Sequence, residues 1–171
     1  MTPTLRTQRL VLRPYQRSDF DSYAAFMASD RAVHINGPLD REKAWAWFTN
    51  DVASWALYGF GMLAIEKDGA LAGGVGLVHP PHFPEPECGW FIYDGFTGMG
   101  LAAEAARAVI DHSFAATDLD TIVSYVSTGN AASIRVAENL GAVLDPDAAA
   151  PEATGTLVYR HTPNSPQRSV L

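Results

Sequence analysis

A glycine-rich turn carries the clearest chemical signal in the sequence. It runs from Thr97 to Ala102 as Thr-Gly-Met-Gly-Leu-Ala, after an apolar segment and before a helical pattern. Glycines let backbone N–H groups converge on an anion without a Cβ in the way, and the following helix adds the positive end of its dipole. This strand–turn–helix context favours a phosphate site over a tight turn that binds nothing.

The same glycines also fit a dinucleotide-binding fingerprint, because Gly-x-Gly-x-x-Ala begins at Gly98. In that fold, the acid that binds the ribose ends the second strand. Here Asp118 and Asp120 precede the apolar run that starts near Thr121, so they lie at the wrong end of a strand. The turn also follows a predicted antiparallel hairpin instead of opening a βαβ unit. A nicotinamide site is therefore disfavoured.

The remaining reactive residue types have simpler interpretations. Cys88 is the only cysteine, so no internal disulfide can form; without an evident His or Asp partner, it is predicted to be a small core residue. The histidines show no metal-ligand spacing, so no metal is expected. Trp45, Phe48, Val52 and Trp55 fall on one stripe of a predicted helix, which indicates packing in the core more than a substrate box.

The elements around the turn are predicted to form a mixed sheet with helices on its faces. Ser18 and Asp40 are suited to cap two helices, and Asp68-Gly69 is a strong hairpin-turn signal. Alternating or continuous apolar runs predict the strands, and apolar residues at helical spacing predict the helices. The predicted strands cover residues 9–13, 62–67, 70–78, 87–93, 121–126, 142–144 and 155–161, and two further helices cover 100–116 and 131–140.

Length and composition fit one globular domain. The chain has 171 residues, of which 47% are hydrophobic and 18% charged. We predict a single domain over 1–161 and a tail over 162–171. The net charge of −7 and the lack of a basic stripe argue against nucleic-acid binding. No apolar run is long enough to cross a bilayer, and the N-terminus lacks the layout of a secretion signal, so a cytoplasmic protein without a membrane partner is expected.

Three motifs resemble the GNAT N-acetyltransferases. The turn is similar to the family's coenzyme A loop, Gln/Arg-x-x-Gly-x-Gly/Ala, with Thr97 in place of the Gln or Arg. Residues 130–142 are similar to the Asn-x-x-Ser helix that ends in Gly-Phe, with Ala142 in place of Phe. Residues 5–14, followed by Asp19-Phe20, resemble the start of the Rim-type branch, which includes enzymes that acetylate ribosomal-protein N-termini.

The resemblance covers roughly residues 5–161 and implies a fold and an activity. The fold is α/β (α+β), with a mixed, mostly antiparallel sheet of about seven strands that splays in the middle, and about four helices. The activity is acetyl-CoA-dependent transfer of an acetyl group to a primary amine, either a protein N-terminus or a small molecule, by direct attack in a ternary complex. Homodimers are common among relatives. The alternative is a non-catalytic acyl-CoA-binding sensor.

The resemblance also assigns roles to residues. Glu87 is the candidate general base, with a solvated charge as the alternative, and Glu85 and Glu152 are weaker candidates. Ser133 matches the residue that is proposed to protonate the departing thiolate in the Rim-type branch. Many other members use a Tyr at the position of Ala137, so Ser133 or water is left for this role. Asn130 would bind pantetheine or cap its helix, and an N–H near Phe91 or Ile92 would stabilise the oxyanion. The residues predicted to bind coenzyme A are Trp90, Phe91, Ile92, Thr97, Gly98, Met99, Gly100, Leu101, Ala102, Asn130 and Ser133.

Overall fold

The computed structural model describes residues 1–151 and 155–163. Two sequence predictions lie outside this part of the chain: Glu152 as a competing base, and the tail beyond residue 163. Within the described residues, no helix is long and apolar enough to cross a membrane.

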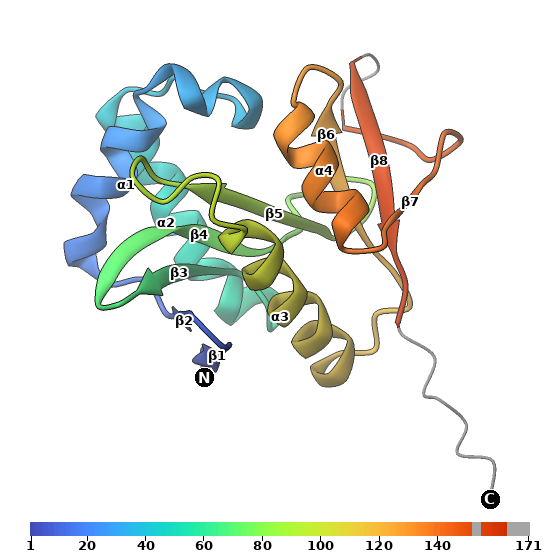
Figure 1. The fold of residues 1–171 in the computed structure, drawn as a ribbon, viewed down its shortest axis with the longest axis horizontal. Coiled ribbons are helices and arrows are strands. Elements are labelled where there is room, and N and C mark those ends of the chain that lie inside the picture. The colour runs from blue at the N-terminus through green and yellow to red at the C-terminus, as the bar shows by residue number, and fades with distance from the viewer. Residues whose placement is uncertain (152–154, 164–171) are drawn as a thin grey trace, which may run out of the picture.

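A single eight-stranded sheet forms the framework of the molecule (Figure 1). Neighbouring strands pair antiparallel everywhere except between β5 and β6, which run parallel. In sheet order the strands are β1 (Leu5–Arg6), β2 (Val11–Arg13), β3 (Met62–Lys67), β4 (Ala70–Val78), β5 (Glu87–Ile92), β6 (Ile122–Ser127), β8 (Thr156–His161) and β7 (Val143–Leu144). The predicted mixed, mostly antiparallel sheet is confirmed.

Helices cover both faces of this sheet. The α-helices are α1 (Phe20–Met27), α2 (Arg41–Tyr58), α3 (Leu101–Ala116) and α4 (Ala131–Asn139), and the 3₁₀ helices are η1 (Arg17–Asp19) and η2 (Asp30–Ile35). Side chains of α3 pack in one core cluster with Cys88, while side chains of α1 and α2 form another, against which Phe91 packs. Because successive strand residues point to opposite faces, β5 contributes side chains to both clusters.

The sheet opens between its two parallel strands. β5 and β6 are paired at one position only, where Glu87 lies opposite Val123. β5 continues along β4 through six paired positions, whereas β6 turns to β8, with which it also pairs at six. Figure 1 shows β5 and β6 diverging from their point of contact. The edge of β5 beyond Glu87 therefore faces a space between the two parts of the sheet.

Most predicted elements are confirmed, and three details are wrong. Strand β1 was not predicted, because two residues are too short a segment for alternation to reveal. Ser18 does not cap α1: it lies within η1, and α1 begins at Phe20 with Asp19 in the cap position. Asp19 instead accepts two hydrogen bonds from the guanidinium of Arg13, at 2.8 and 3.0 Å.

The predicted apolar stripe of α2 is the third error. Phe48 is buried and Trp55 packs against the core, but Trp45 and Val52 are 41% and 44% exposed. The residue that occupies the buried face in place of Val52 is Asp51.

Candidate active site

Two cavities meet where β5 and β6 diverge. The larger cavity has a volume of about 670 Å³ and the smaller cavity about 310 Å³. Both volumes lie within the range of small-molecule sites. Five residues line both cavities and form a shared wall: Val33, His34, Ile35, Trp90 and Phe91. The two cavities are therefore immediate neighbours, with these five residues bordering both.

The glycine turn forms one side of the larger cavity. Gly98 and Gly100 both have φ of 75°, a left-handed conformation that glycine adopts without strain. Gly100 is the N-cap of α3, and no described side chain caps this helix. The first-turn N–H groups of α3 are thus left for an external acceptor, and they lie at the positive end of the helix dipole. This arrangement fits a pyrophosphate group.

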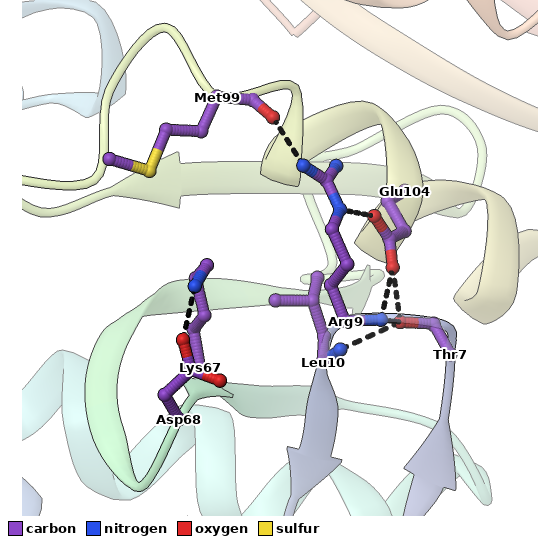
Figure 2. Close-up of polar contacts among 7 residues, drawn as sticks. All are labelled: Thr7, Arg9, Leu10, Lys67, Asp68, Met99 and Glu104. Atoms are coloured by element: carbon purple, nitrogen blue, oxygen red, sulfur yellow. Dashed lines mark hydrogen bonds and ion pairs between the residues drawn. The ribbon is translucent and has the colours of Figure 1, made fainter.

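The N-terminal segment holds the turn in place (Figure 2). The Arg9 guanidinium donates a hydrogen bond to the carbonyl of Met99 at 2.9 Å and another to Glu104 Oε2 at 2.6 Å. Thr7 Oγ1 and the Arg9 N–H donate to Glu104 Oε1 at 2.5 and 2.9 Å. Since Glu104 lies in the first turn of α3, this cluster fixes the turn to the helix. We call Thr7, Arg9 and Glu104 the brace.

Most residues predicted to bind coenzyme A lie around the larger cavity. Its lining includes Trp90, Phe91, Ile92, Thr97, Gly98, Gly100, Leu101, Ala102, Asn130 and Ser133. Met99 is the exception: it is not among the lining residues, its side chain is 46% exposed, and its carbonyl is engaged by Arg9.

The start of α4 forms another part of the larger cavity. Asn130 is the N-cap of this helix, and its Oδ1 accepts a hydrogen bond from the N–H of Ser133 at 3.1 Å. Both side chains are half-buried. The capping interpretation of Asn130 is therefore correct, and its position in the cavity wall also allows a contact with pantetheine. Ala137 is fully buried one turn further on.

Glu87 lies in the wall of the smaller cavity. Burial raises the pKa of its carboxyl group to about 7, against the opposing effect of the Tyr125 backbone N–H. The carboxyl group is half-buried, so it is not simply a solvated charge. A carboxyl group that titrates near neutral pH is suited to accept and release a proton there.

The weaker candidate, Glu85, is engaged elsewhere. Its carboxylate forms a bidentate ion pair with the Arg160 guanidinium, with N–O distances of 2.6 and 2.9 Å. It lines neither cavity. Cys88 is buried in the core as predicted, and burial raises the pKa of its thiol well above the usual range. Among residues 1–151 and 155–163, no group of three potential metal ligands is found.

Asp51 is a residue of the smaller cavity that the sequence did not reveal. It is only 7% exposed, its Oδ2 accepts a hydrogen bond from Tyr23 Oη at 3.0 Å, and burial raises its pKa to about 7. A signal was present, since Ala44, Phe48, Asp51 and Trp55 recur at helical spacing. An ionisable residue within such a stripe indicates a buried charge, and buried charges cluster at functional sites.

Arg31 is the second residue that was missed. Its guanidinium donates a hydrogen bond to the carbonyl of Ile92 at 2.9 Å, pairs with Asp94 and lines the larger cavity. Arg31 belongs to the 3₁₀ helix η2. Arg31 therefore ties η2, which carries three of the five residues of the shared wall, to the end of β5.

Comparisons with known proteins agree with this geometry. A family model described as an acetyltransferase (GNAT) domain matches residues 9–143. An acetyltransferase from Agrobacterium tumefaciens str. C58 is 46% identical and superposes with a TM-score of 0.89, covering 93% of this chain and 94% of its own. YkkB from Bacillus subtilis (strain 168) is 28% identical over 144 residues, which are 80% of this chain and 83% of YkkB.

A third likeness concerns the fold alone. RimL, a ribosomal L7/L12 alpha-N-protein acetyltransferase, has been solved in complex with coenzyme A. It is 16% identical to this chain and superposes with a TM-score of 0.76, covering 94% of this chain and 98% of its own. Because the family model covers most of the sequence and the glycine turn fits a pyrophosphate, the chain belongs to the GNAT acetyltransferase family, whose members transfer an acyl group from acetyl-CoA.

Proposed function

We propose that this chain transfers the acetyl group of acetyl-CoA directly to a primary amine while both substrates are bound. The observation that carries the proposal is the wall shared by the two cavities. The larger cavity has the glycine turn and the start of α4 for the donor, and the smaller cavity has Glu87 for the amine. Holding both reactants in one geometry supplies much of the rate enhancement of such reactions.

In this proposal the residues divide the proton transfers between them. Glu87 takes a proton from the ammonium, directly or through water, and the freed lone pair forms the C–N bond with the thioester carbonyl carbon. A backbone N–H near Phe91 or Ile92 stabilises the negative charge that develops on the carbonyl oxygen. As the C–S bond breaks, Ser133 donates a proton to sulfur and regains one from the nitrogen. One proton thus leaves through Glu87 and the other ends on the thiol.

The position of Cys88 supports direct attack over an acyl-enzyme route. Its side chain packs in the core and lines neither cavity. Because burial raises the pKa of its thiol, the nucleophilic thiolate is disfavoured.

The test is release of free thiol from acetyl-CoA in the presence of a panel of primary amines, with the product identified by its mass. We expect amine-stimulated release by the wild-type chain, and about 100-fold slower release by Glu87→Gln at neutral pH. The alternative function is the non-catalytic sensor. Tight coenzyme A binding without stimulated release by any amine or peptide N-terminus would favour it.

A further inference from the structure

The smaller cavity contains two carboxyl groups and no basic counterpart. Asp51 comes from α2 and Glu87 from β5, and neither Lys nor Arg is among the described lining residues. Within the part of the lining that the structure describes, only His34 and His82 have side chains that can become positively charged, and both residues are exposed. A ligand that enters this cavity meets two acidic groups and, among the described lining residues, no Lys or Arg.

Asp51 is held in a fixed position and retains an acceptor atom. Tyr23, itself buried, donates to Oδ2, and its ring packs edge-on against Phe48 and Phe91. Among the described residues no hydrogen bond reaches Asp51 Oδ1. This oxygen is therefore available to a ligand in the cavity that Asp51 lines.

The two carboxyl groups would have different fates in the proposed reaction. The ammonium that reacts gives a proton to Glu87 and becomes a neutral amide. Asp51 takes no part in that transfer, so beside a monoamine it must either keep its proton or carry an unpaired buried charge. A buried carboxylate without a partner is costly, and a second cationic group on the acceptor would remove that cost.

The rest of the cavity suits the chain between two such charges. Trp47, Trp90 and Phe91 line it, and aromatic faces attract both alkyl groups and ammonium ions. The volume of about 310 Å³ fits a small molecule. A carboxylate on the acceptor would be repelled by both acids, and the described part of the lining offers it no Lys or Arg.

We propose that the acceptor is a small diamine without a carboxylate, whose reacting amine lies beside Glu87 and whose second ammonium binds Asp51 Oδ1. This inference rests on the proposed acetyl transfer, and it assigns Asp51 as a specificity-determining residue.

Three acceptors of matched shape test it: 1,5-diaminopentane, n-hexylamine and 6-aminohexanoate, which place a cation, a methyl group and an anion at the far end. We expect kcat/KM to fall in that order, with the diamine at least 10-fold better than n-hexylamine. A short peptide with a free N-terminus completes the series and should be poorer than the diamine.

Asp51→Asn keeps the shape of the side chain and can still accept the Tyr23 hydrogen bond, but it loses the charge. We expect it to remove most of the diamine preference, chiefly through KM, while n-hexylamine changes less than threefold. Asp111→Asn, an exposed residue on α3, is the matched control and should leave both values unchanged. If Asp51→Asn does not fold, the order of the four acceptors with the wild-type chain still decides the question.

The outcomes separate the inference from the proposed function. Acetylation of n-hexylamine, 6-aminohexanoate or the peptide as fast as the diamine would overturn the diamine proposal and leave acetyl transfer standing. An Asp51→Asn variant that folds and keeps the wild-type preference would overturn the role of Asp51. Absence of thiol release with every acceptor, despite coenzyme A binding, would instead overturn the proposed function.

Discussion

The larger and smaller cavities are built from different parts of the chain. The larger cavity offers an anion the backbone N–H groups of the glycine turn and the start of α3, in a conformation set by Gly98 and Gly100. The smaller cavity instead relies on side chains, and its carboxyl groups at Asp51 and Glu87 have pKa values that burial raises to about 7. The larger cavity should therefore be sensitive to backbone changes and the smaller one to charge and pH.

The largest effect is expected from Gly100→Val. At φ of 75° a β-branched residue is strained, and the side chain would obstruct the approach of the pyrophosphate. We expect the coenzyme A dissociation constant to rise at least 100-fold, as measured by calorimetry. Gly59 at the end of α2 also has φ of 75°, so Gly59→Val reproduces the strain outside both cavities and should leave affinity unchanged. Equal affinity in the two variants would refute the backbone site.

The next largest effect is expected from Glu87→Gln in the smaller cavity, and it should depend on pH. Wild-type kcat/KM should rise as pH increases through about 7, because Glu87 accepts a proton only when ionised. Glu87→Gln should lose about 100-fold in rate at neutral pH and less near pH 9, where more of the amine is already free. The check is a pH–rate profile of both proteins. A variant with wild-type rates at every pH would exclude Glu87 as the base.

A smaller effect is expected from the brace. Arg9→Ala removes the guanidinium's hydrogen bonds to the Met99 carbonyl and to Glu104 Oε2, so the glycine turn should become less ordered before it binds coenzyme A. We expect coenzyme A affinity to fall about 10-fold, or about 1.4 kcal/mol, with little change in the KM of the amine. Arg41→Ala, which removes an exposed ion pair with Asp21, is the control. A raised KM for the amine together with unchanged coenzyme A affinity would show that the brace does not support the coenzyme A site.

The smallest effect concerns stability. Between pH 4 and 7 folded Asp51 retains a proton that the unfolded chain has released, since its pKa rises from 3.8 to about 7. Its contribution to stability therefore declines as pH rises through this window. Asp51→Asn lacks this dependence, so its Tm should exceed that of the wild type by several degrees at pH 8 and by less at pH 5.

Thermal unfolding of Asp51→Asn and Asp111→Asn at the two pH values provides the measurement. Asp111 is exposed, so its variant should follow the wild-type Tm at both. If the Tm difference between Asp51→Asn and the wild type is the same at pH 5 and pH 8, burial does not govern the ionisation of Asp51.

Local signals explain which features the sequence predicted. The hairpin around Asp68-Gly69 and the glycine turn depend on residues adjacent in the chain, and both are found where expected. The shared wall joins η2 to β5, and its formation depends on a long-range contact from Arg31. Asp51 was overlooked because Val52 fits the helical stripe almost as well, and only packing against Tyr23 determines which residue faces inward.

The shared wall has a consequence for inhibitor design. His34, Trp90 and Phe91 border both cavities, so the two sites lie next to one another and one linked molecule can be designed to reach both. A conjugate of coenzyme A and a diamine, joined from sulfur to nitrogen by a two-carbon acyl spacer, would bring the second fragment to its site at high effective concentration. Such a bisubstrate ligand should bind more tightly than either fragment alone, and its affinity should depend on both Gly100 and Asp51.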